Sequence, residues 1–137
     1  MEPVTITRRV DFVLSPGELW QLVTSPDALS GWLGDSVDLD LRPSGAGVIV
    51  DGDIVRNLRV TEVVDGRRLR FVWCDRDDPR TPSQVTFDVE GDDDGGSRLV
   101  ITETLVASGA KVADAQTAWE VRVMSLWACT VVAALVQ

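Results

Sequence analysis

The last quarter of the sequence constrains the fold more than any other part. Residues 110–136 are predicted to form one long helix, with an apolar face that carries Trp119, Val123 and Trp127. After Arg122 the predicted helix is apolar on nearly all sides. A helix of this kind needs a second element against which to bury its apolar residues. We expect that element to be a curved sheet, with a cavity between the sheet and the helix.

The chain before this helix is predicted to supply the sheet. Val4–Val13 alternates between apolar and polar residues, which is typical of a half-buried strand. The sequence Ser15-Pro16-Gly17-Glu18 favours a capped helix start, and a second short helix is expected to begin near Pro26. Further strands are expected at 37–41, 47–50, 58–64, 69–73, 85–89 and 99–103, with a polar loop at Asp75–Ser83.

Short hairpin turns between these strands predict an antiparallel sheet. The fold class is therefore α+β: six or seven antiparallel strands wrapped around the long C-terminal helix, with two short helices after the first strand. The length of 137 residues fits a single domain over residues 1–137.

Composition argues against several classes of partner. The formal net charge is −9 and the basic residues are scattered, which is unfavourable for binding nucleic acid or an anionic membrane surface. The apolar run Val123–Val136 would span only about two-thirds of a ~30 Å hydrocarbon core at ~1.5 Å per residue. The first residues lack the apolar segment of a signal peptide, and Cys74 and Cys129 are expected to be buried free thiols. These observations favour a cytoplasmic protein.

The residues needed for several kinds of catalysis are missing from the sequence. It has no histidine and no tyrosine, which excludes Ser-His-Asp and Cys-His arrangements and histidine-based metal sites. The segment Glu90–Gly95 has calcium-loop character, but Ile101 stands where a calcium loop needs a bidentate glutamate. We therefore expect no metal and no cofactor, and we read that segment as a solvated hairpin tip.

Several segments of the chain, in this order, resemble the START/Bet v 1-like superfamily, and more narrowly the family named for the activator of the Hsp90 ATPase. The matching segments are Ser15–Trp20, Thr24–Trp32, Asp40–Gly45, Glu62–Trp73 and Gly96–Leu105, together with Trp119.

The resemblance implies a helix-grip fold with a hydrophobic cavity under the last helix. Members of the superfamily include lipid and polyketide binders, cyclases and the eukaryotic chaperone activator. Two departures stand out: Leu33 replaces the second tryptophan of a pair common in the family, and Arg56-Asn57-Leu58 lacks a glycine that is common before the fourth strand.

Glu103 is the most informative single residue. Strand alternation puts it on the same face as Leu99 and Ile101, so its carboxylate must be paired or must be neutral inside the protein. Alternation also puts Arg8 on the inward face of the first strand, which in this fold neighbours the last strand. We consider two readings: an Arg8–Glu103 ion pair at the sheet edge, or a polar group that orients a ligand or supplies an acid.

The other candidate ligand contacts are apolar side chains expected on the cavity wall. Tryptophans can fill a core or line a small-molecule site, and Trp73 and Trp119 are the best candidates for the second role. The full set of candidate ligand-binding residues is Trp73, Trp119, Val123, Trp127, Phe87, Ile101, Glu103, Arg8 and Trp32.

The sequence thus favours a protein that binds a hydrophobic or amphipathic small molecule without transforming it. One alternative is an enzyme of the polyketide cyclase or dehydratase type that uses a cavity carboxylate, and another is a protein-binding module of the co-chaperone type. The outer face of the last helix is also apolar, and it is expected either to be covered or to form the interface of a homodimer or another partner. Its residues are Val121, Met124, Ala128, Val132 and Leu135.

Overall fold

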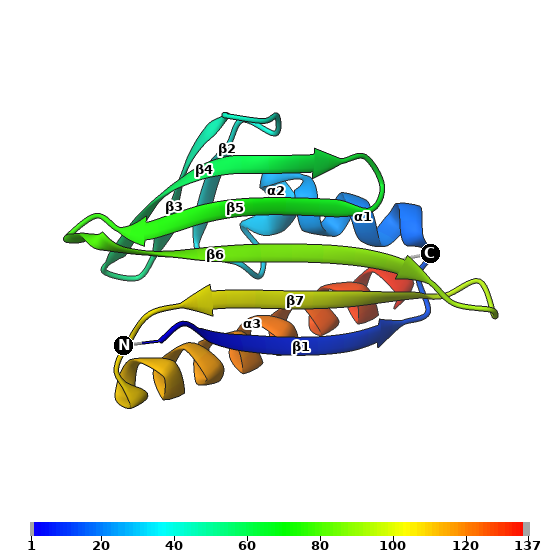
Figure 1. Cartoon of the computed structure of the whole chain (residues 1–137). Helices are drawn as coiled ribbons and strands as arrows, with labels where there is room; N and C mark the ends of the chain where they lie inside the picture. The colour runs from blue at the N-terminus through cyan, green and yellow to red at the C-terminus, as the bar shows by residue number, and fades with distance from the viewer. Residues whose placement is uncertain (1, 136–137) are drawn as a thin grey trace.

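The structure is a computed structural model that describes the backbone of residues 2–135 and the side chains of residues 2–131. Its central element is one seven-stranded antiparallel sheet with the strand order β1-β7-β6-β5-β4-β3-β2 (Figure 1). Neighbouring strands are consecutive in the chain except for β1, which pairs with β7. The strands are β1 Val4–Phe12, β2 Ser36–Leu39, β3 Ala46–Asp51, β4 Ile54–Val64, β5 Arg68–Asp75, β6 Asp78–Gly91 and β7 Ser97–Leu105.

Three helices pack on one side of this sheet (Figure 1). They are α1 Pro16–Thr24, α2 Pro26–Leu29 and α3 Gly109–Leu135. The predicted capping box at the start of α1 is present: the Ser15 hydroxyl accepts from the Glu18 backbone N–H, and the Glu18 carboxylate accepts from the Ser15 N–H. The α+β helix-grip architecture predicted from the sequence is confirmed.

Strand register decides which residues face the helices. In the β6–β7 pair, Val89 lies opposite Leu99, Phe87 opposite Ile101, and Val85 opposite Glu103. All the apolar members of these pairs are buried, and Glu103 is only 5% exposed. The prediction that Glu103 points inward is therefore correct.

Two strands extend further than the sequence pattern predicted. The predicted polar loop Asp75–Ser83 is wrong, because β6 already begins at Asp78. The strand β4 begins at Ile54 rather than near residue 58. The β6 extension is polar and irregular: it contains Pro79 and Pro82, and its register with β5 shifts between Trp73 and Asp75, whereas the β4 extension is short and holds both apolar and polar residues. Proline and low apolar content hide such segments from a search for alternation.

The buried face of α3 also differs from the predicted face. Trp119 is fully buried, but the residues that follow it on the buried side are Arg122, Leu126 and Thr130. Trp127 is 55% exposed. Helix geometry explains the difference. Trp127 follows Trp119 by eight residues and therefore points about 80° away from it around the helix axis, whereas Leu126 follows by seven residues and differs by only about 20°.

Candidate functional site

The candidate site is a cavity of about 820 Å³ between the N-terminal half of α3 and the sheet. Its walls come from β4, β5, β6, the end of β7 and the segment that joins β7 to α3. The β4 and β6 extensions contribute Ile54, Arg56, Thr81 and Ser83. The apolar part of the lining includes Ile54, Trp73, Leu105, Val106, Ala115 and Ala118.

Glu103 is the centre of a hydrogen-bond network on the inner wall of this cavity. Its Oε2 accepts from Trp73 Nε1 at 2.9 Å and from the Ser83 hydroxyl at 2.6 Å. Its Oε1 accepts from Trp119 Nε1 at 2.8 Å. Both indole N–H groups and both carboxylate oxygens therefore have partners inside the protein, as buried polar groups require. The two indoles are stacked, with ring centroids 6.0 Å apart.

Arg122 lies over the two indoles that Glu103 binds. Its Cζ is 4.6 Å from the Trp119 ring centroid and 5.2 Å from that of Trp73, within cation–π range. The Arg122 residue is 7% exposed. Burial, and then repulsion from Arg56, lower the pKa of Arg122 from its ordinary value to about 10, although Glu103 and Asp51 act in the opposite direction.

Arg56 approaches the same aromatic pair from β4. Its Cζ is 4.9 Å from the Trp73 ring centroid, and it lines the cavity together with Arg122. Exposed charges mark the rim, where Lys111 Nζ lies 3.7 Å from Asp78 Oδ2. The cavity thus combines apolar walls, a buried polar centre and charged edges, which is the usual composition of a small-molecule site.

The predicted ion pair between Arg8 and Glu103 is wrong. Arg8 Nη2 instead donates to Glu120 on α3 at 3.1 Å. Register explains the difference, because Arg8 lies opposite Ile101 on β7, whereas Glu103 lies opposite Ile6. Arg8 therefore ties the edge strand to the outside of the helix.

Four other candidates lie away from the cavity wall, in packed or half-buried positions. Trp32 is 4% exposed, packs on Phe87 with ring centroids 5.4 Å apart, and donates its N–H to the Leu22 carbonyl. Phe87 and Ile101 are at most 1% exposed and belong to the hydrophobic core. Val123 is half-buried against that core. Of the nine candidates, Trp73 and Glu103 line the cavity, and Trp119 supports them from within the core.

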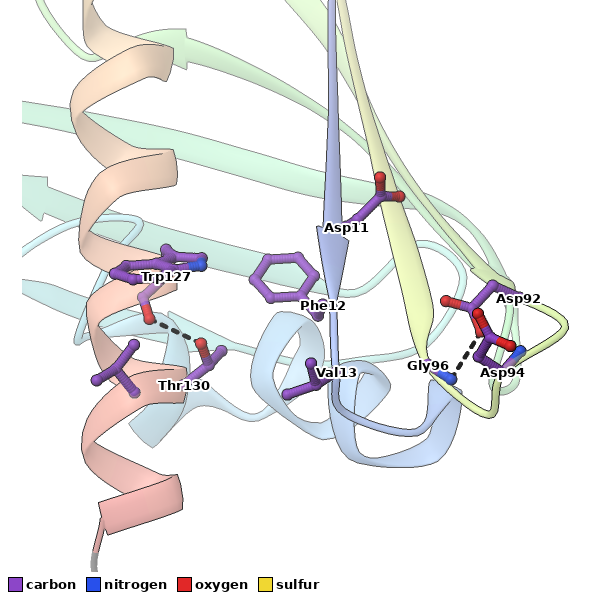
Figure 2. A pocket seen from close by; sticks show the side chains of 9 residues that line it. Asp11, Phe12, Val13, Asp92, Asp94, Gly96, Trp127 and Thr130 are labelled. Atoms are coloured by element: carbon purple, nitrogen blue, oxygen red, sulfur yellow. Dashed lines mark hydrogen bonds between the residues drawn. The ribbon is translucent and has the colours of Figure 1, made fainter.

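Trp127 lies at the other end of α3, in a separate hollow of about 570 Å³. Figure 2 shows its indole beside Phe12, with Thr130 on the next turn of the helix and the β6–β7 hairpin across the opening. Asp92 holds that hairpin tip, since its Oδ1 accepts from the backbone N–H groups of Asp94 and Gly96. The segment read as a hairpin rather than a calcium loop is indeed a β6–β7 turn.

Comparison with known families agrees with this arrangement. The model of the family described as Activator of Hsp90 ATPase homolog 1-like protein matches residues 14–129, which is most of the chain. The chain belongs to this family. No curated protein matches the sequence.

Solved structures share the fold of this member of the Activator of Hsp90 ATPase homolog 1-like family at low sequence identity. DynU16, from the dynemicin biosynthetic locus, is 21% identical with a TM-score of 0.79, over 89% of this chain but only 45% of that chain. MLL2253 from Mesorhizobium loti is 20% identical with a TM-score of 0.81, over 90% of this chain and 93% of that chain. The Aha1 dimer from Colwellia psychrerythraea is 17% identical with a TM-score of 0.77, over 90% and 92%. The chain therefore spans less than half of DynU16, and these likenesses show a shared fold.

Sequence reasoning missed three polar residues of the site in this family member: Arg56, Ser83 and Arg122. A signal existed for Arg122, because it follows Trp119 by three residues and therefore lies on the same helix face. Ser83 lies in the segment predicted to be a loop, and Arg56 precedes the strand predicted over 58–64, so no pattern placed them near Glu103.

Other features of the described residues bear on the classes considered above. Within residues 2–135, no helix has the length and hydropathy needed to cross a bilayer. In the same part of the chain, no three acidic, cysteine or histidine side chains are grouped so that they could hold a metal ion. Cys74 and Cys129 are free, as expected, but they are half-buried rather than fully buried.

Proposed function

We propose that this protein binds a small hydrophobic or amphipathic molecule in the cavity between β4–β7 and the N-terminal half of α3, without transforming it. The observation that carries the proposal is the cavity itself. Its volume is about 820 Å³, within the range of small-molecule sites, and it lies beside the stacked Trp73–Trp119 pair. Its apolar lining would supply most of the affinity, at about 25 cal/mol per Å² removed from water.

The state of Glu103 supports binding over catalysis. A cyclase or dehydratase would need a side chain free to exchange a proton with its substrate. Both oxygens of Glu103 already accept hydrogen bonds from fixed donors, two indole N–H groups and the Ser83 hydroxyl. This carboxylate therefore holds the aromatic wall in place, and its occupied oxygens leave it poorly suited to act as a general acid or base.

A pair of helix positions offers a matched test. Ala118 lines the cavity, whereas Ala128 is exposed on α3. We expect Ala118→Trp to fill the cavity and to abolish retention of a copurified small molecule in native mass spectrometry, whereas Ala128→Trp retains it. Retention by Ala118→Trp at the wild-type level would refute the proposal. A co-chaperone role would give the reverse pattern, with the surface variant losing a protein partner.

We also propose self-association through the outer face of α3. Val121 and Met124 are 58% and 70% exposed there, while Val132 and Leu135 of the predicted surface lie outside the residues whose side chains are described. The related Aha1 structure from Colwellia psychrerythraea is a dimer. Sedimentation of the wild type and of Met124→Glu tests this: a concentration-dependent dimer that the variant loses supports it, and a monomer at all concentrations contradicts it.

A cytoplasmic location is part of the same proposal. Both cysteines are free thiols, which suits a reducing compartment.

A further inference from the structure

Two arginines meet at the inner wall of the cavity. Arg56 comes from β4 and Arg122 from α3, and both guanidinium groups lie over the face of Trp73, at 4.9 and 5.2 Å from its ring centroid. Both residues line the cavity. Two cations held near one another in a partly buried place repel, and repulsion from Arg56 contributes to the lowered pKa of Arg122 after the larger effect of burial.

Neither arginine has its hydrogen-bonding capacity filled. Among the described residues, no acceptor bonds the buried Nη1 of Arg56 or the buried Nε of Arg122. Arg122 is 7% exposed, so its unpaired donor lies inside the protein. A buried donor without a partner is costly, and native proteins rarely keep one without a reason.

The nearby carboxylates do not satisfy these donors. Glu103 accepts its three hydrogen bonds from Trp73, Ser83 and Trp119, and none from an arginine. Asp51 Oδ2 is 4.0 Å from Arg122 Nη2, which is too far for a hydrogen bond. Asp75 lies opposite Arg56 across β4 and β5, but its Oδ1 accepts from the Asp77 backbone N–H, and within the described residues no hydrogen bond or ion pair joins it to Arg56.

We propose that Arg56 and Arg122 form a binding subsite for the carboxylate of an amphipathic organic acid, whose apolar part occupies the rest of the cavity. The proposal rests on the proposed function and deepens it by naming the ligand class. A guanidinium matches a carboxylate through parallel N–H donors, and the flanking indoles give the apolar part of the acid a flat surface.

Charge counting favours a monoanion over a phosphate. Of the charged residues in the lining, three are basic, Arg56, Lys111 and Arg122, and four are acidic, Asp75, Asp78, Glu103 and Asp114, so the lining as a whole has no excess positive charge. The two arginines are a local positive site, which Asp75, opposite Arg56 across β4 and β5, and Asp51, 4.0 Å from Arg122, already offset in part. A dianionic headgroup would exceed the positive charge of the inner wall and would be repelled at the rim.

Isosteric probes test this subsite by isothermal titration calorimetry on the full chain. We use octanoate against octanamide, and 2-naphthoate against 2-naphthamide, so that each acid differs from its amide in charge and not in shape. The wild type is expected to bind each acid at least about tenfold more tightly than its amide, the range expected for a charge-assisted hydrogen bond. Octyl phosphate is expected to bind more weakly than octanoate.

Two variants test whether Arg56 and Arg122 cause the preference for acids over amides. Arg122→Met keeps an unbranched side chain against the indoles, and Arg56→Gln changes a residue that is more exposed than Arg122. Each is expected to lower the preference for the acid by about tenfold while leaving amide binding unchanged. The control is Arg8→Gln, because Arg8 binds Glu120 outside the cavity and should not affect the preference.

The outcomes separate this inference from the proposed function. Equal binding of acids and amides by the wild type, or an unchanged preference in Arg56→Gln, would overturn the carboxylate subsite while the cavity remains a binding site. Tighter binding of octyl phosphate than of octanoate would also overturn it. Failure of all five probes to bind would count against the proposed function itself.

Discussion

The two halves of α3 rest on interiors of different kinds. The C-terminal half contributes Leu126, fully buried in the apolar core, and Cys129, whose Sγ is 4.0 Å from the Gly31 carbonyl oxygen beside α2, while Trp127 and Thr130 line the smaller hollow on another side of the helix. The N-terminal half covers the cavity, and there the helix presents Trp119 and Arg122 to the buried Glu103. One end of the helix is packed against side chains, and the other end is linked to the sheet through polar and aromatic contacts.

The two halves of α3 therefore differ in what they contribute: one chiefly to the stability of the fold, the other to the wall of the proposed binding site. A filled apolar core contributes most of the free energy of folding, because each buried side chain is removed from water and makes close contacts. A polar centre contributes less net stability, because its hydrogen bonds replace those with water. What it provides is a wall of fixed geometry beside an unfilled volume.

The largest effect is expected in the packed half. Leu126→Ala removes a fully buried side chain from α3 and should lower the free energy of unfolding by about 3 kcal/mol. Urea denaturation measures this, with Met124→Ala as the control, since Met124 is 70% exposed and should change stability by less than about 0.5 kcal/mol. The preference for acids over amides should persist in Leu126→Ala. Its loss would show that the two halves are not independent.

A smaller loss of stability is expected at the polar centre. In Glu103→Gln, an amide nitrogen replaces one carboxylate oxygen: facing Trp119, it leaves that N–H without an acceptor, and facing Trp73, it leaves that N–H with the Ser83 hydroxyl alone and forces this hydroxyl to turn. In either orientation a buried donor loses a bond to a charged acceptor. We expect a loss of about 2 kcal/mol, within the range for a buried unsatisfied donor. Near-ultraviolet circular dichroism should also change, because the stacked indoles lose their common anchor. A stable variant with an unaltered near-ultraviolet spectrum would contradict the proposed role of Glu103.

The same contrast explains how far the sequence could predict the molecule. The packed half obeys simple periodicity: the pairing of Val89, Phe87 and Ile101 across β6 and β7 followed from alternation and a hairpin turn. The capping box at Ser15 followed from local chemistry. In both cases the relevant partners are near in sequence or are fixed by a repeat.

The cavity half was predicted only in part, because its walls break those patterns. Arg56 and Ser83 lie on strand extensions, of which the one in β6 is polar and contains prolines. The inward parity of Glu103 was predictable from its own strand, but its partners come from β5, β6 and α3. Nothing local in a sequence tells which distant donors a buried carboxylate will find.

Removing the cation from the polar centre should affect stability least. The lowered pKa of Arg122, about 10, corresponds to about 3 kcal/mol of unfavourable burial and of repulsion from Arg56, net of the attraction of Glu103 and Asp51. Contact with two indoles offsets this by about 1–4 kcal/mol. We therefore expect Arg122→Met to change the free energy of unfolding by no more than about 1 kcal/mol in urea denaturation, although it loses the preference for acids. A loss of stability as large as that of Leu126→Ala would mean that Arg122 is chiefly a structural residue.

The smallest expected effect is the pH dependence of the contribution that Arg122 makes to stability and to the preference for acids. The chain has no histidine, so the preference for acids should be constant between about pH 6 and pH 8. Arg122 has a pKa of about 10 in the folded protein, below its ordinary value in the unfolded chain. Between these values the unfolded chain keeps a proton that the folded protein has released, so stability from this group rises with pH.

The difference between the wild type and Arg122→Met isolates the contribution of Arg122 to the pH dependence of stability. Raising the pH from 9 to 11 should shift the stability difference by about 1 kcal/mol in favour of the wild type. Over the same interval the wild type should lose its preference for octanoate over octanamide, because the released proton removes the charge that the carboxylate needs. Urea denaturation and calorimetry at pH 9, 10 and 11 measure the two effects. Opposite trends that both begin near pH 10 would identify Arg122 as the group responsible for both, whereas a stability difference and a preference that are both flat to pH 11 would exclude it.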